Sequence, residues 1–100
     1  LFDCITVYIS NLVCAKSVAE LAKEDALYTE AKANIQALID TVKAANATVI
    51  FVTNEVGAGI VPENHLARIY RDLSGSVNQQ LACASDEVYA VICGIPMQLK

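Results

Sequence analysis

Several features that would assign this chain to a common class are missing from its sequence. It contains no run of about 18 apolar residues, which argues against a membrane span, and no signal peptide is visible. Its 7 lysines and arginines are outnumbered by 11 aspartates and glutamates, for a net charge of -4. Binding to nucleic acid or to acidic membranes favours a basic surface, so the charge supports neither. There is also no internal repeat, low-complexity segment or linker.

The cysteines lack the spacing of a zinc or dithiol site. Cys4, Cys14, Cys83 and Cys93 form no Cys-x-x-Cys pair. Because Cys4 and Cys93 fall in apolar runs, we expect all four to be free thiols in or near the core of a cytoplasmic protein.

The residues that are present suit a small globular unit. One hundred residues, of which 55% are hydrophobic, predict a single domain with a modest core. The sequence begins at Leu1, without methionine, and its first residues are those of the predicted strand. We therefore expect that an upstream part of the protein is absent from this sequence.

Apolar patterning predicts alternating strands and helices. We expect strands at residues 1–5, 49–53 and 87–93, and a possible edge strand at 97–99. Periodicity does not decide between strand and helix over residues 6–14, and we favour helix. The order predicts an α/β fold with a mostly parallel sheet, flanking helices and right-handed crossovers.

Two long helices are expected between these strands. Ser17 and Glu20 have capping-box spacing and begin a helical stretch that runs, with a possible break, to residue 45. Asn46 would then be a left-handed cap. Pro62-Glu63 would begin the second long helix, whose apolar face reaches Leu81.

The strongest functional signal follows the central strand. The strand at 49–53 stops at Asn54-Glu55, and a loop with Gly57 and Gly59 comes next. In open α/β sheets, ligands bind just beyond the carboxyl ends of strands. This position predicts a ligand site at Asn54-Glu55.

Several motifs together resemble one known family. They are Asp3-Cys-Ile-Thr6 followed by Ser10-Asn-Leu12, Asn54-Glu-Val-Gly-x-Gly-Ile-Val-Pro-Glu63, Arg71-Asp-x-x-Gly-x-x-Asn-Gln79, Ala84-x-Asp-Glu-Val88 and Gly94-Ile-Pro96. Over residues 1–100 the chain is similar to the bifunctional adenosylcobinamide kinase / adenosylcobinamide-phosphate guanylyltransferase of cobalamin biosynthesis. The block that starts at Asn54 is the most specific part of the resemblance.

The resemblance implies a RecA-like P-loop NTPase fold and a homotrimer. It implies adenosylcobinamide and a nucleoside triphosphate as substrates, with Mg²⁺ accompanying GTP or ATP. A phosphoryl group goes to the aminopropanol hydroxyl, and GMP then reaches that phosphate through a guanylylated histidine.

The same resemblance places the phosphate loop and the guanylylated histidine upstream. No G-x-x-x-x-G-K-S/T motif occurs in these 100 residues. The chain therefore resembles the carboxyl-terminal part of a single P-loop kinase/nucleotidyltransferase domain, and we expect it to be inactive alone.

The resemblance also implies roles for the acidic strand ends. Asp3 would bind Mg²⁺ and the nucleotide; the alternative is a cap of the following turn. Glu55 would be catalytic, by orienting or deprotonating the cobinamide hydroxyl, and Asn54 would bind substrate. The alternative for both is loop scaffolding.

On the second long helix, Arg71 and Asn78 are predicted to bind substrate, since both belong to a family-like block. For Arg68 we favour an exposed helix face with an ion pair to Asp72. His65, the only histidine, is expected at the surface or an interface, because the family's nucleophile lies upstream.

Two other functions remain open. The chain could be a non-catalytic α/β module that acts in oligomer assembly, an interpretation that the missing phosphate loop favours. It could also belong to another P-loop group such as the RecA-like ATPases, although the block from Asn54 to Glu63 argues against this.

Overall fold

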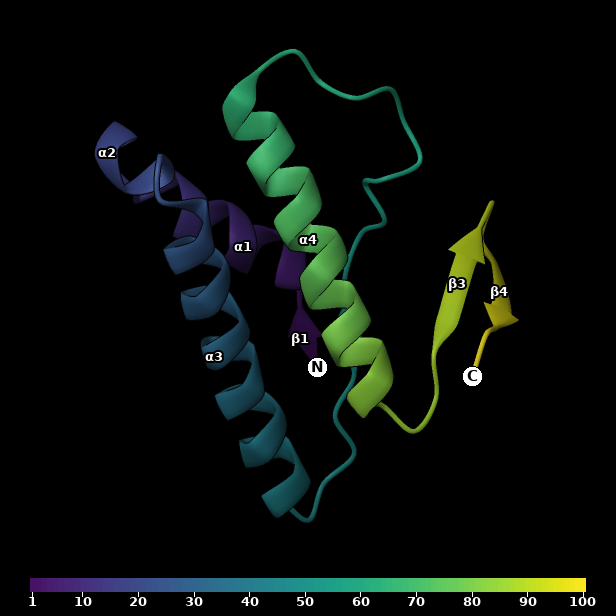
Figure 1. Ribbon diagram of the computed structural model, residues 1–100. Coiled ribbons are helices and arrows are strands. Elements are labelled where there is room, and N and C mark those ends of the chain that lie inside the picture. Colours follow the sequence, from purple (N-terminus) through teal and green to yellow (C-terminus); the bar gives the residue numbers. More distant parts are fainter.

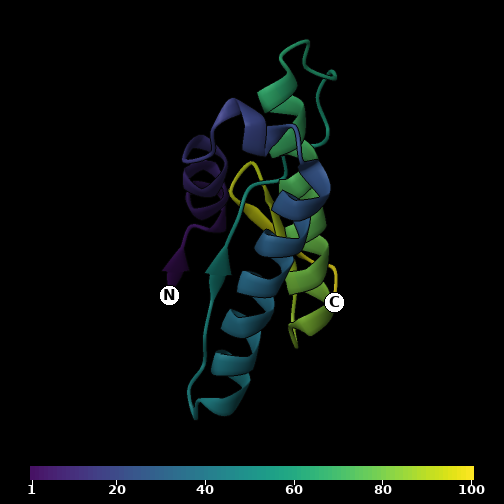
Figure 2. The same ribbon diagram turned by 60° about the vertical axis from the view of Figure 1, so that its left-hand side comes forward.

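The computed structural model describes residues 1–100 as an α/β unit of helices on a short sheet, followed by a hairpin (Figure 1). The elements are β1 (Phe2–Asp3), α1 (Ile5–Cys14), α2 (Val18–Leu21), α3 (Glu24–Ala44), β2 (Phe51–Val52), α4 (His65–Ala84), β3 (Tyr89–Ile92) and β4 (Ile95–Gln98). Figures 1 and 2 show α3 and α4 side by side and running in the same direction, while the chain returns through β2 in the opposite direction beside β1.

The sheet is the parallel pair that the strand–helix–strand order predicts. Phe2 lies opposite Phe51 and Asp3 opposite Val52. On the covered face, the two phenylalanine rings lie 6.0 Å apart between centroids and pack against the core. On the other face, Val52 is 37% exposed and Ile50 is 59% exposed. The helices therefore cover one side of the sheet.

The core lies between α1, α3 and α4. Only 12 of the 100 residues are buried, and all of them belong to these helices. Buried positions recur every three or four residues, as one face of a helix requires. They are Ile5, Ile9 and Val13 of α1; Leu27, Ala31, Ile35 and Ile39 of α3; and Ile69, Leu73, Val77 and Leu81 of α4.

The predicted capping box is confirmed. Ser17 Oγ accepts the Glu20 N–H at 3.3 Å, and Glu20 Oε2 accepts the Ser17 N–H at 2.8 Å. The helix that follows breaks after Leu21, so α2 and α3 are separate. The left-handed cap at Asn46 is wrong, because Cys93 is the only non-glycine residue with a positive φ.

The second long helix begins later than predicted. Asn64 is the N-cap, and its Oδ1 accepts the Ala67 N–H at 3.0 Å. Pro62 and Glu63 therefore remain in the loop. An amide that satisfies one of the free N–H groups of the first turn fixes the helix start more firmly than Pro62 does.

The prediction that the third strand joins the parallel sheet is wrong. Instead, β3 pairs antiparallel with β4, Tyr89 opposite Gln98 and Ile92 opposite Ile95. Cys93 and Gly94 have φ values of 53° and 77°, the left-handed conformations of a tight two-residue hairpin turn. Figure 1 shows this hairpin beside α4, apart from the other strands.

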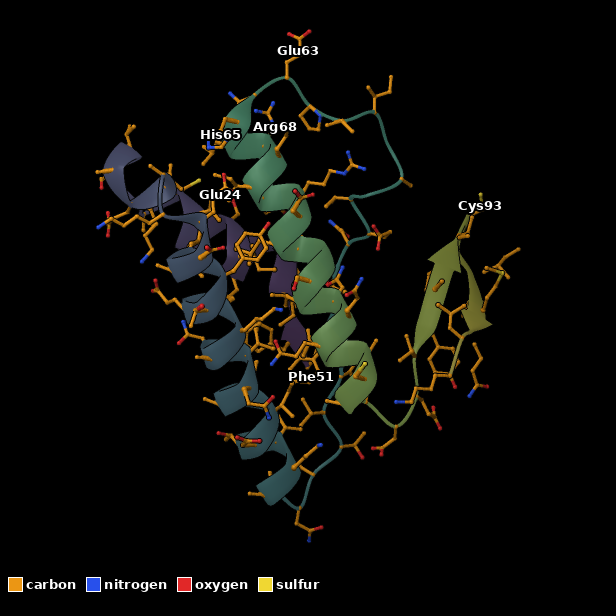
Figure 3. All side chains as sticks on the ribbon, in the orientation of Figure 1. Glu24, Phe51, Glu63, His65, Arg68 and Cys93 are labelled. Atoms are coloured by element: carbon orange, nitrogen blue, oxygen red, sulfur yellow. The ribbon has the colours of Figure 1, made fainter.

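Three of the four cysteines do not lie in or near the core, where we expected them. Cys14, Cys83 and Cys93 are exposed and Cys4 is half-buried, and all four are free. Cys14 and Cys83 fall outside the apolar rows of α1 and α4. Cys93 lies at the tip of the hairpin (Figure 3). No helix of the chain combines the length and the apolar character needed to cross a bilayer.

Candidate functional site

The predicted site residues of both short strands lie at one edge of the sheet. Asp3 ends β1, and Asn54 and Glu55 follow the end of β2. Because the strands are parallel and Asp3 is opposite Val52, their carboxyl ends meet at the same edge. The Asn54 N–H donates to Thr6 Oγ1 at 2.9 Å, which joins the loop after β2 to the first turn of α1.

Asn78 ties the same loop to α4. Its Nδ2 donates to the Asn54 carbonyl at 3.0 Å, and its Oδ1 accepts the Thr53 hydroxyl at 2.7 Å. Both polar atoms of the amide thus bind the loop. We predicted that Asn78 contacts substrate. In the structure its side chain is bonded to the Asn54 carbonyl and to the Thr53 hydroxyl.

Glu55 is exposed and folds back onto its own loop. Its Oε1 accepts the Gly57 N–H at 2.7 Å. A Cβ at Gly57 would lie 2.8 Å from that oxygen, closer than real Cβ atoms approach. Gly57 has no positive φ, so a Cβ there would be opposed only by the flexible Glu55 carboxylate, which would have to move, and not by backbone conformation. At Gly59, in contrast, a Cβ would meet no atom within 4 Å.

Arg71 holds Gly57 from the other side. Its Nη2 donates to the Gly57 carbonyl at 2.8 Å. Both backbone groups of Gly57 are therefore bonded to side chains. Beside this contact lies an open depression of about 370 Å³. Its walls contain no hydrophobic residue; they are Gly57, Arg71, Asp72, Gly75, Ser76 and Gln79.

Arg68 and His65 lie at the start of α4. Arg68 Nη1 donates to the Pro62 carbonyl at 3.0 Å and also to that of Glu63. The expected ion pair with Asp72 is not formed, because the guanidinium turns to these unpaired loop carbonyls. His65 is exposed, as expected, and its Nε2 lies 3.4 Å from Glu24 Oε1 at the start of α3 (Figure 3).

The carboxylates of the chain form no complete metal site. No group of three or more His, Cys, Asp or Glu side chains is placed to hold a metal ion. Asp3 is a single exposed carboxylate at the edge of the sheet. Mg²⁺ commonly takes one or two carboxylates and completes its shell with water and phosphate oxygens. Asp3 therefore fits a Mg²⁺ ion that arrives with a nucleotide.

Two residues of the site were not singled out from the sequence. Thr6 and Thr53 fix the loop through their hydroxyls. Thr6 lies inside the motif that begins at Asp3, which is a signal that could have found it. Thr53 ends a β-branched run and gives no comparable signal.

Comparison with known proteins gives one consistent result. The family model described as cobinamide kinase / cobinamide phosphate guanyltransferase matches residues 1–99. The bifunctional adenosylcobalamin biosynthesis protein CobU of Salmonella typhimurium is 45% identical, and that of Escherichia coli 43%. Each match covers 100% of this chain and 57% of the relative. The bifunctional protein CobP of Pseudomonas aeruginosa is 31% identical, with 100% of this chain and 52% of CobP covered. The chain thus spans little more than half the length of these relatives.

Proposed function

Because the chain belongs to the cobinamide kinase / cobinamide phosphate guanyltransferase family, we propose that it forms the acceptor side of such an active site. The intact enzyme would phosphorylate adenosylcobinamide and then transfer GMP from GTP to adenosylcobinamide phosphate in cobalamin biosynthesis. The observation that carries this proposal is the strand-end arrangement, in which Asp3 and the fixed Asn54-Glu55 loop share one edge of the parallel sheet.

Phosphoryl transfer depends mainly on positioning and on offsetting charge. In this proposal Asp3 would hold Mg²⁺, an ion that offsets the negative charge of the phosphates of GTP or ATP. Glu55 orients the substrate hydroxyl or accepts its proton, after its carboxylate leaves the Gly57 N–H. Asn54 and Arg71 contact substrate. Asn78, which we predicted to bind substrate, would instead position Asn54 through its bond to the Asn54 carbonyl.

The exposed hairpin favours a second candidate, a non-catalytic role in oligomer assembly. Apolar side chains of β3 and β4 face solvent, with Val91 and Ile95 each 66% exposed. Such residues gather where a partner covers them. The homotrimer and the cytoplasmic location that the resemblance implies remain part of the proposal, and the four free thiols agree with a reducing compartment.

The proposal is tested by joining this chain to the segment of the Salmonella relative that lies outside the match. The fusion protein is assayed for GTP-dependent phosphorylation of adenosylcobinamide. We expect activity, and a loss of about 100-fold or more for Asp3→Asn and for Glu55→Gln. Asp40→Asn, on the last turns of α3, is the matched control and should keep full activity.

The outcomes separate the two candidates. A folded fusion protein that binds GTP but phosphorylates nothing would contradict the enzymatic role. Full activity of both site variants would contradict the residue assignment alone. Titration of the isolated chain with GTP and Mg²⁺ addresses the second candidate, since a Kd of about micromolar would contradict a purely non-catalytic module.

A further inference from the structure

The polar depression beside Gly57 is lined by hydrogen-bonding side chains. It is open to solvent, and its wall on α4 is formed by residues one turn apart, Arg71, Gly75 and Gln79, with Asp72 and Ser76 beside them. A Cβ at Gly75 would meet no atom within 4 Å, so the glycine leaves the space free.

The hydrogen-bonding groups around this space are largely unused. Arg71 has five N–H donors, and its one bond within the protein goes to the Gly57 carbonyl. The carboxylate of Asp72 accepts only, and the Ser76 hydroxyl and Gln79 amide can both donate and accept. No hydrogen bond or ion pair within the chain engages these three side chains. A ligand would therefore find donors and acceptors together.

This combination disfavours a phosphate and an apolar group. The single cation, Arg71, is offset by Asp72 in the same wall, so the depression has no excess of positive charge. The Gly57 N–H, which could have contributed to an anion site, is already bound by Glu55. An apolar group would find no hydrophobic wall. The group that matches is neutral, with donors and acceptors side by side, as in a primary carboxamide.

We propose that this depression binds carboxamide side arms of a corrinoid. The inference rests on the proposed function, because the corrin ring of cobinamide carries carboxamides around its rim. Gly57 connects the two regions, since it forms one wall of the depression and its N–H is bonded to Glu55. A side arm anchored by Arg71 and Gln79 would hold the rest of the corrinoid next to Glu55. A volume of about 370 Å³ accommodates side arms, while the ring itself stays outside.

The test is an NMR titration of the ¹⁵N-labelled chain with dicyanocobinamide and, separately, with inorganic phosphate. We expect dicyanocobinamide to shift the backbone amides of Gly57 and Gly75 and the side-chain amide of Gln79 in a saturable manner. Phosphate should shift none of them. Gly75→Leu fills the space and should weaken corrinoid binding by about tenfold or more. Ala33→Leu, on an exposed face of α3, is the matched control and should bind as the unsubstituted chain does.

Gly75→Leu is expected to fold, because leucine is a better helix former than glycine and the space is open. If circular dichroism shows that it does not, Gln79→Ala removes one donor–acceptor pair without filling the space, and should also weaken binding. Shifts with phosphate in place of the corrinoid would overturn the proposal in favour of an anion site. Dicyanocobinamide could instead shift only the amide signals of Asn54 and Glu55, and do so equally in the substituted chains. That result would overturn the side-arm site while leaving the proposed function standing. An absence of corrinoid-induced shifts anywhere in the chain would also overturn it, whereas the proposed function is tested separately by the activity of the fusion protein.

Discussion

Replacing Gly57 with alanine should separate the stability of this chain from its proposed activity. The new Cβ would lie 2.8 Å from Glu55 Oε1, so the carboxylate must move and its bond to the Gly57 N–H must break. Loss of one such bond costs about 0.5–1.5 kcal/mol. Alanine also restricts the unfolded chain, which offsets about 0.4–1 kcal/mol, since Gly57 has no positive φ that alanine would resist. The net change in the free energy of unfolding is therefore within about 1 kcal/mol.

The effect on activity should be much larger. If Glu55 acts on the substrate hydroxyl, its displacement should lower phosphorylation by the fusion protein by about 100-fold. Urea unfolding measures the stability change, and GTP-dependent phosphorylation of adenosylcobinamide measures the activity. Gly59→Ala is the matched control, because its Cβ meets no atom within 4 Å. Its activity should be unchanged, and its free energy of unfolding should rise by about 0.4–1 kcal/mol from restriction of the unfolded chain alone. Full activity of Gly57→Ala would refute the reasoning, since the position of Glu55 would then not matter for the reaction.

Three further predictions concern other parts of the chain. Leu73 is 0% exposed, so Leu73→Ala should lower the free energy of unfolding by about 2–5 kcal/mol in urea, whereas Leu66→Ala, at a 37% exposed position, should cost about 1 kcal/mol or less. Equal losses would contradict the assignment of the core. Asn78→Ala removes both bonds to the loop after β2 and should speed hydrogen exchange there by about fivefold or more, since each bond contributes about 0.5–1.5 kcal/mol; unchanged exchange would show that the loop is fixed by other contacts. The pKa of Glu20 lies below its usual range, mainly because its carboxylate accepts the backbone N–H of Ser17 and secondarily because it accepts the hydroxyl. Because the pKa of Glu20 is lowered by folding, the stabilisation from its ionised carboxylate is present above the pKa of the unfolded state. It is lost as pH falls through the pKa of the folded state. Ser17→Ala should therefore raise the pKa of Glu20 part of the way back in an NMR titration, and no change would contradict a role for the hydroxyl.

The helices follow from local patterns, and the hairpin does not. Apolar residues every three or four positions predicted α3 and α4, because burial of one helix face is a property of the segment itself. Residues 6–14 were ambiguous, since Val7 adds an exposed apolar residue outside the row of Ile5, Ile9 and Val13 that the core selects. The hairpin turns at Cys93-Gly94, and this pair lacks the Asn or Asp that normally marks such a turn.

The site could be located from the sequence, but its contacts could not. The end of a predicted strand identified Asn54-Glu55, because parallel strands bring their carboxyl ends to one edge. The bonds from Asn78 and Arg71 to the loop depend on how α4 is rotated and placed against β2. That geometry results from packing between segments far apart in the chain, which no local pattern encodes. The bond from Glu55 to Gly57 spans only two residues, so the Glu-x-Gly spacing was a usable signal.

The common direction of α3 and α4 also shapes the electric field of the molecule. Their first turns lie together, as the 3.4 Å approach of His65 to Glu24 shows, and α1 begins directly after Asp3 at the edge of the sheet. Each helix amino end carries a partial positive charge of about half a unit from its aligned peptide dipoles. Two such ends are therefore adjacent in a chain whose formal net charge is -4. Where α3 and α4 begin, these dipoles offset part of the negative charge of Glu24 and Asp25, an effect that the sum of side-chain charges does not reveal.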